Sequence, residues 1–222
     1  MRIERKNWCQ AMLERFKYPK ELEKVTTGDE TYVFYEQYKG EKQWTFEDED
    51  IPRVTKQLKF THKKRMYTPF FSSKGIVHAG IQTSNRAAKS PDYKLHPEQV
   101  KENLGVDVAD IVIHNDNAPI HKSRLMQKFY EESGTERLTH PRYSLDLAPN
   151  NFWLIRKLWK LLSTEIVKDD SDLHEKVVKI LNEILVSEFE KCFQEWLNRM
   201  QRCINENGNY FESKKRVIKR KF

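Results

Sequence analysis

The sequence of 222 residues is poor in cysteine and glycine and has no long apolar run. Its three cysteines are far apart, which excludes a disulfide framework or a zinc-binding pattern and favours a reducing compartment. No segment approaches the roughly 20 apolar residues of a membrane-spanning helix, and the first residues lack the apolar stretch of a secretion signal. Neither a glycine-rich phosphate loop nor a nucleophilic Ser–His arrangement stands out.

Positive charge is plentiful but unevenly placed. The formal net charge is +7, and six of the last nine residues, 214–222, are Lys or Arg. A second basic stretch, residues 52–75, contains no Asp or Glu. Two interpretations stay open. One is a solvated loop with a frayed tail, and the other is a phosphate-contacting loop with a tail for nuclear import or nucleic-acid binding.

Hydrophobic patterning predicts one α/β domain with strands early and helices late. The expected strands are 25–38, a hairpin over 66–82, a short central strand at 110–114 and another near 137–139. The expected helices are 5–18, one near 97–104, one after Pro119 and several in the C-terminal third.

Acidic and amide side chains occur near the predicted strand ends in three segments, 27–31, 116–121 and 143–151. Strand-end acids of neighbouring strands can meet at one edge of a sheet, where α/β proteins commonly place their sites. Carboxylates that meet repel one another unless a cation lies between them, and oxygen ligands suit Mg²⁺ and Mn²⁺. The pattern is therefore compatible with two-metal phosphodiester chemistry, although isolated surface acids would look similar.

The order and spacing of these segments resemble the catalytic region of mariner transposases. The matching motifs are Thr27-Gly28-Asp29-Glu30-Thr31, Asp116-Asn117-Ala118-Pro119-x-His121 and His140-Pro141-x-Tyr143-Ser144-x-Asp146-Leu147-Ala148-Pro149. The segment 189–212 resembles the last helix and terminus of the same family, and the resemblance extends over about residues 5–212.

The resemblance implies an α/β, RNase H-like fold in which a mixed sheet is flanked by helices. It divides the chain into an N-terminal helix or linker remnant (1–24), a catalytic domain (25–212) and a basic tail (213–222). It also implies a cut-and-paste DNA transposase that uses Mg²⁺ or Mn²⁺ in a two-metal site. The basic tail, by contrast, is what suggests a location in the nucleus. The implied partners are DNA and a second copy of the chain in a homodimer, without a membrane.

Carried over by motif, the catalytic and metal-binding residues are Asp29, Asp116 and Asn151. The family has a third Asp after 34 intervening residues, where this sequence has Asn151. An Asn offers an amide oxygen but no negative charge, so we expect the second metal to be held weakly. The expected DNA-contacting residues are Arg53, Lys56, Lys59, Lys63, Lys64, Arg65 and His121. For His121, a position beside Asp116 that supports this ligand and a surface position at a helix start stay open as alternatives.

A second departure concerns the N-terminus. Mariner transposases carry paired helix-turn-helix domains before the catalytic region, whereas this sequence starts just before that region. We therefore expect a truncated domain that contacts DNA largely independently of sequence. The alternatives are a weakened transposase or endonuclease, a non-catalytic, domesticated or decayed nuclear DNA-binding or dimerisation module, and a genomic fossil with no selected role.

Strand alternation predicts that Glu30 points away from Asp29 and has a structural role. Asp146 is expected to be a turn or helix-start residue, and His140 to be structural. Trp153, Trp159 and Trp196 are predicted to lie in the core.

Overall fold

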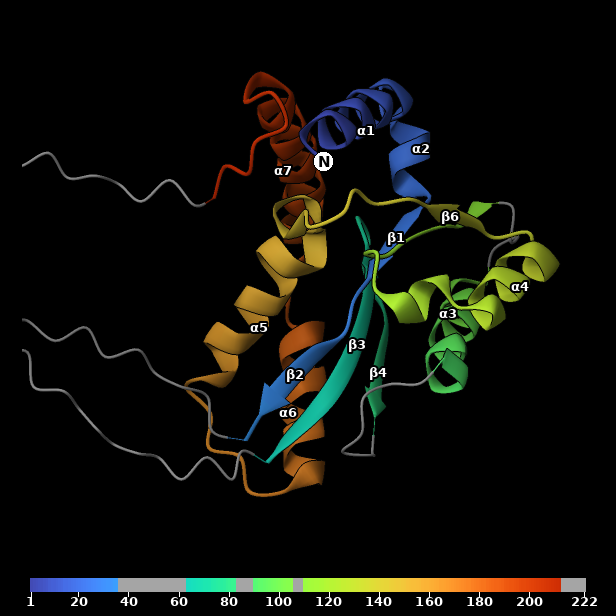
Figure 1. Ribbon diagram of the computed structural model, residues 1–222. Helices are drawn as coiled ribbons and strands as arrows, with labels where there is room; N and C mark the ends of the chain where they lie inside the picture. Colours follow the sequence, from blue (N-terminus) through green and yellow to red (C-terminus); the bar gives the residue numbers. More distant parts are fainter. Residues whose placement is uncertain (36–62, 83–89, 106–109, 213–222) are drawn as a thin grey trace, which may run out of the picture.

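The computed structural model describes residues 1–35, 63–82, 90–105 and 110–212 (Figure 1). Its strands are β1 (Val25–Gly28), β2 (Thr31–Phe34), β3 (Lys64–Ser72), β4 (Gly75–Gln82), β5 (Val112–His114) and β6 (Glu136–Leu138). Its α-helices are α1 (Arg2–Arg15), α2 (Pro19–Glu23), α3 (Ser90–Leu104), α4 (Arg124–Ser133), α5 (Ile155–Leu162), α6 (Asp170–Asn182) and α7 (Val186–Asn205). Shorter helical turns cover Pro119–Lys122 (η2), Leu145–Leu147 (η3) and Asn150–Leu154 (η4).

The six described strands form one mixed sheet. β3 is antiparallel to β1, β2 and β4, whereas β1, β5 and β6 run parallel to one another. The parallel strands are linked through helices, as parallel neighbours require. This is the expected RNase H-like mixed sheet with flanking helices, and it brings the carboxyl ends of β1 and β5 side by side.

Helices cover both faces of the sheet, and each face has its own apolar core. Phe71, Val112 and Trp196 belong to the larger core, which lies between the sheet and α1, α5, α6 and α7. Phe70 and Ile113 belong to the smaller core, beneath α3 and α4. Successive residues of β3 and of β5 therefore point to opposite faces, as the pleat of a strand dictates.

Helix α1 packs against α7 at one end of the sheet (Figure 1). Its buried Cys9 belongs to the larger core, and the ring nitrogen of Trp8 donates a hydrogen bond of 2.7 Å to the carbonyl of Thr139. The predicted boundary between the N-terminal segment 1–24 and the domain 25–212 stays a prediction. Helix α1 nevertheless shares the larger core with residues of that domain.

Two predicted elements differ in extent. The expected strand 25–38 is interrupted at Asp29 and Glu30, so that it forms β1 and β2. The helix expected near 97–104 begins at Ser90 and continues through Pro97. Burial of Tyr93 and Val100 in the smaller core outweighs the hydrogen bond that Pro97 cannot donate.

The predicted hairpin is confirmed as β3 and β4. Of the three tryptophans expected in the core, Trp196 is fully buried, Trp153 packs partly buried against the core, and Trp159 is 41% exposed. Within the described residues, none of the helices combines the length and apolar character needed to cross a membrane.

Candidate active site

Asp29 lies in the break between β1 and β2. β1 pairs with β3 at Gly28–Phe70, and β2 pairs with the same strand in the same register, which places Pro69 opposite Asp29. Proline has no backbone N–H to donate, so the hydrogen bonding between the strands is interrupted at this point. Gly28 is needed beside it, because a Cβ there would come within 2.2 Å of the Phe70 ring.

Asp116 follows the end of β5, the parallel neighbour of β1. One of its carboxylate oxygens, Oδ1, accepts a hydrogen bond of 2.8 Å from the backbone N–H of Ala118. The same oxygen lies 2.9 Å from Nδ1 of His121. The turn η2 thus fixes the orientation of the Asp116 side chain.

Asn151 lies in η4, a π-helical turn that leads into α5. Such turns are frequent at functional sites because the extra residue re-aims side chains. The side-chain amide of Asn151 donates a hydrogen bond to Oδ2 of Asp29. The structure therefore brings Asn151 and Asp29 into direct contact, and their role as metal ligands stays a prediction.

The electrostatics of these groups tie Asp29 to Asp116. Burial, together with the neighbouring charges of Asp116 and Glu30, raises the pKa of Asp29 to about 7. Burial also opposes ionisation of Asp116, but its hydrogen bonds with His121 and Ala118 and the charge of His121 together outweigh this effect and lower its pKa. Negative charge thus accumulates around Asp29.

His121 is fully buried and lies between two carboxylates. Its Nε2 is 3.2 Å from Oε1 of Glu30, opposite its contact with Asp116. Burial favours the neutral ring, but these two acids prevail and raise the pKa of His121 to about 10. His121 does not reach the surface, where we expected it to contact DNA; it orients Asp116 instead.

Glu30 contacts a residue of the site, although its side chain points away from Asp29 as strand alternation predicts. Asp29 contacts η4 on one side of the sheet, and Glu30 contacts η2 on the other, as alternation requires. His121 nevertheless joins Glu30 to Asp116 around the end of the sheet. The sequence signal was the His five residues after Asp116, but its partner could not be read from spacing.

A hydrogen-bonded histidine pair lies behind Asp116. His114 Nδ1 is 2.9 Å from the hydroxyl of Thr27, and its Nε2 is 3.0 Å from Nδ1 of His140. His140 Nε2 donates to the carbonyl of Ser144, which can only accept. Nδ1 of the neutral His140 ring therefore accepts from Nε2 of His114, and Nδ1 of His114 accepts from the hydroxyl of Thr27. Burial lowers the pKa of His140 to about 4 and that of His114 well below its usual value. The structural role expected for His140 is thus to connect two segments of the site.

The donor set fits a divalent cation that prefers oxygen. Among the described residues, no three His, Cys, Asp or Glu side chains gather into a metal-binding cluster. The candidate ligands are instead the two Asp carboxylates and the amide oxygen of Asn151. A cation between Asp29 and Asp116 would relieve the charge that raises the pKa of Asp29.

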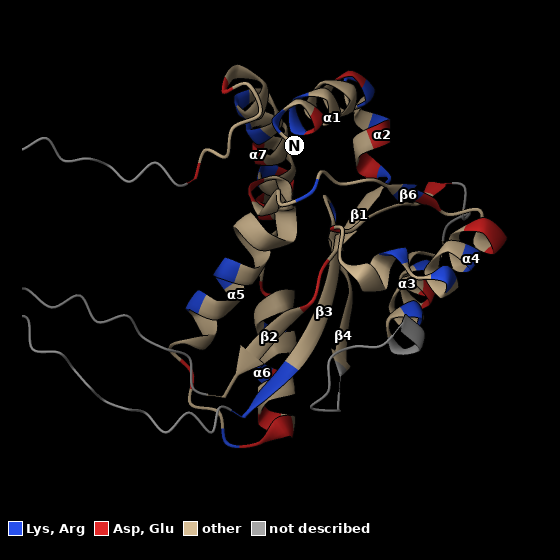
Figure 2. Cartoon of the chain, in the orientation of Figure 1, with Lys and Arg blue, Asp and Glu red and all other residues tan. Residues whose placement is uncertain are grey.

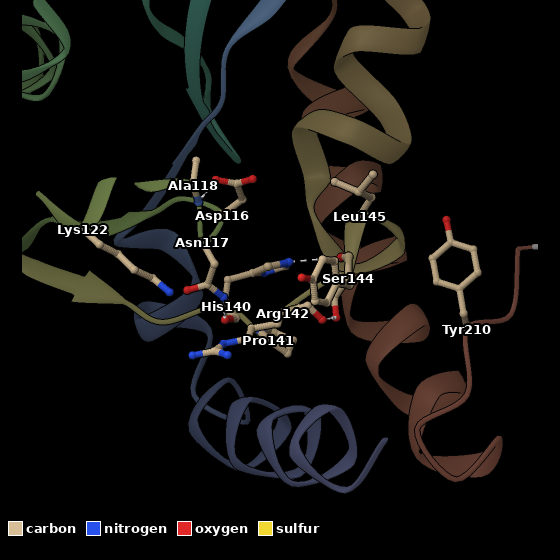
Figure 3. Close-up of a pocket in the computed structure, with 11 residues that line it drawn as sticks. Asp116, Asn117, Ala118, Lys122, His140, Pro141, Arg142, Ser144, Leu145 and Tyr210 are labelled. Atoms are coloured by element: carbon tan, nitrogen blue, oxygen red, sulfur yellow. Dashed lines mark hydrogen bonds between the residues drawn. The ribbon is translucent and has the colours of Figure 1, made fainter. Parts of the chain in front are cut away.

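A cavity of about 600 Å³ opens beside Asp116 (Figure 3). Its lining includes two cationic side chains, Lys122 and Arg142, and two exposed aromatic ones, Tyr143 and Tyr210. Cations and exposed rings are the side chains that bind phosphates and bases of nucleic acids.

The basic stretch is described only from Lys63 onward, so Arg53, Lys56 and Lys59 lie outside the described residues, as does the tail from residue 213. The ammonium group of Lys64 lies 3.8 Å from the ring centre of Tyr32, and Arg65 forms an ion pair of 2.5 Å with Asp170. Figure 2 shows the positive start of β3 and further positive residues on α5.

The chain is similar in sequence to two curated proteins. It is 25% identical over 224 residues to the mariner Mos1 transposase of Drosophila mauritiana, and the match covers 94% of this chain and 62% of the transposase. It is 23% identical over 197 residues to the human histone-lysine N-methyltransferase SETMAR, a match that covers 86% of this chain and 29% of SETMAR. The chain thus spans less than two thirds of either relative. No family model matches it.

Solved structures show the same fold. The crystal structure of the catalytic domain of Mos1 mariner transposase superposes with a TM-score of 0.77 at 20% identity, covering 95% of each chain. A pre-cleavage Mos1 transpososome gives a TM-score of 0.84 at 21% identity, covering 95% of this chain and 64% of the other. The chain is therefore homologous to the Mos1 transposase along its catalytic domain and has the RNase H-like fold of that domain.

Proposed function

We propose that the chain is a mariner-type DNA transposase catalytic domain that cleaves and transfers DNA strands with Mg²⁺ or Mn²⁺. The convergence of Asp29, Asp116 and Asn151 at one edge of the sheet carries this proposal. The homology to the mariner Mos1 transposase supports the transposase type of function. Structures of the Mos1 catalytic domain with Mn and with Mg support the choice of metal.

In this proposal the carboxylates of Asp29 and Asp116 hold the metal, and the amide oxygen of Asn151 is a third, neutral ligand. The bound ion would activate the attacking oxygen and stabilise the leaving oxygen of the phosphodiester. His121 keeps one oxygen of Asp116 engaged, so that the other remains available as a ligand. Because Asn151 brings no charge, we expect the second metal to be held weakly and cleavage to be slow.

DNA contact is assigned to described cations at one end of β3 and beside the site. Lys63 directly precedes β3 and Lys64 is its first residue, and Lys122 and Arg142 line the cavity beside Asp116. The predicted contribution of Arg53, Lys56 and Lys59 belongs to the same proposal. Such phosphate contacts are sequence-independent and weaken with salt. Homodimerisation and a nuclear location, the latter through the basic tail, complete the proposal.

A second candidate is a non-catalytic DNA-binding or dimerisation module of the same fold. Asn151 favours it, because a neutral amide at the third ligand position brings no negative charge to hold a metal. The two candidates differ in one measurable property, which is cleavage of DNA.

The test is to incubate the purified protein with labelled duplex and flap DNA and Mn²⁺, beside Asn151→Asp and Asp116→Ala variants. We expect slow nicking by the native chain, faster nicking by Asn151→Asp and none by Asp116→Ala. If neither the native chain nor Asn151→Asp cleaves, the enzymatic proposal fails, and DNA binding by the same samples then supports the second candidate.

A further inference from the structure

Asn115 is a fully buried residue whose side-chain amide makes three hydrogen bonds, two from its nitrogen and one to its oxygen. Its nitrogen donates to the carbonyl of Gly28 at 2.9 Å and to the hydroxyl of Tyr93 at 2.8 Å. Its oxygen accepts from the hydroxyl of Tyr130 at 3.3 Å. The carbonyl of Gly28 can only accept, so the orientation of the amide is fixed.

The bond to Gly28 joins the two residues that directly precede the candidate carboxylates. Gly28 directly precedes Asp29, and Asn115 directly precedes Asp116. The backbone pairing of β1 with β5 includes Thr27 and His114 as its last pair. The side chain of Asn115 therefore continues the connection between the two strands by one residue, at the point where both carboxylates leave the sheet.

The two tyrosines hold the amide from the helices that cover this face. Tyr93 belongs to α3 and is fully buried, and its ring also lies 4.6 Å from the ring of His121. Tyr130 belongs to α4. Packing of α3 and α4 thus limits how far the end of β5 can move relative to β1.

We propose that Asn115 is a positioning residue that sets the spacing of Asp29 and Asp116 and thereby the affinity of the site for a divalent cation. The inference rests on the proposed function, because it concerns the same pair of carboxylates. Partners that orient metal ligands typically change metal affinity by about 10- to 100-fold when they are removed.

The experiment measures the dissociation constant of Mn²⁺ alone, from the electron paramagnetic resonance signal of the free ion, in the native chain and in Asn151→Asp. Asn115→Ala is introduced into both, and Asn103→Ala is the matched control. Asn103 also donates from its amide to a backbone carbonyl, that of Val77 at 2.8 Å, but it is exposed on α3. We expect Asn115→Ala to weaken Mn²⁺ binding at least ~10-fold and Asn103→Ala to change it less than ~2-fold.

Cooperative thermal unfolding shows that each variant is folded. If Asn115→Ala does not fold, the double variant Tyr93→Phe with Tyr130→Phe, which keeps the amide but removes its two hydroxyl partners, is expected to weaken binding in the same direction. An unchanged Mn²⁺ affinity in a folded variant overturns the inference alone. If neither the native chain nor Asn151→Asp binds Mn²⁺ at millimolar concentration, the proposed function fails together with it.

Discussion

The guanidinium group of Arg5 binds both carboxylate oxygens of Asp146 inside the protein, at 2.8 and 2.6 Å. Both side chains are less than 5% exposed. Arg5 also donates from Nε to the carbonyl of Gly208. One residue of α1 therefore anchors both η3, which precedes Asn151 in the chain, and the segment after α7.

Replacing Arg5 with Ala is expected to lower the free energy of unfolding by about 3–5 kcal/mol, because Asp146 would stay buried without its partner. Arg15→Ala is the control, since its partners Glu21 and Glu136 are 31% and 51% exposed, and we expect a loss of about 1 kcal/mol or less. Urea titrations followed by circular dichroism measure both. Equal losses in the two variants would contradict the buried ion pair as an anchor.

Gly28→Ala is expected to destabilise the protein by about 1–3 kcal/mol, because the new methyl group would overlap the ring of Phe70. Phe70→Leu makes room for that methyl group. The double variant should therefore lose less stability than the two single variants added together. Additive losses in denaturant titrations would count against the close approach of this ring.

His140 should contribute stability that is lost as the pH falls below neutrality. Burial lowers its pKa to about 4 in the folded state, against roughly 6.5 in an unfolded chain. Between these values the unfolded state binds the proton and the folded state does not, so the contribution of His140 is complete above pH ~6.5 and is lost as the pH falls towards 4.

Between pH 7 and pH 5 this effect amounts to about 2 kcal/mol. His140→Gln cannot titrate in this range, so its unfolding free energy should fall by that much less over the same interval. Denaturant titrations at the two pH values compare the proteins. Parallel pH profiles would show that His140 is not buried in its neutral form.

Lys63 and Lys64 are expected to contact DNA phosphates. Replacing both with Gln should weaken duplex binding for all sequences alike and should reduce the slope of log K against log salt by about 2. Fluorescence anisotropy at several salt concentrations gives the slope. Lys17→Gln with Lys179→Gln, which changes an exposed lysine after the end of α1 and another on α6, is the control, and an equal effect there would indicate a nonspecific charge effect.

The order of strands and helices could be predicted largely because apolar periodicity is a local property of the sequence. The hairpin of β3 and β4 and the short central strand β5 came directly from it. The interruption at Asp29 could not, because it depends on Pro69, which is 40 positions away and becomes its opposite neighbour only after the sheet forms.

The site could be predicted from motifs as far as Asp29, Asp116 and Asn151. The residues that orient them are harder to assign from sequence. The motif leaves His121 open between DNA contact and support of Asp116, and no pattern in the sequence singles out Asn115. Their roles depend on partners from other elements, Glu30 for His121 and Gly28 for Asn115, and sequence spacing does not report such pairs.

The contact of α1 with α7 bears on how the protein is made. Arg5 and the carbonyl of Gly208 are 203 residues apart, so the larger core stays incomplete until the segment after α7 has also left the ribosome. At cellular rates of synthesis this takes roughly 10–40 s, during which α1 has no partner helix. We therefore expect nascent chains that lack α7 to depend on chaperones and to be cleared by proteases when translation stalls.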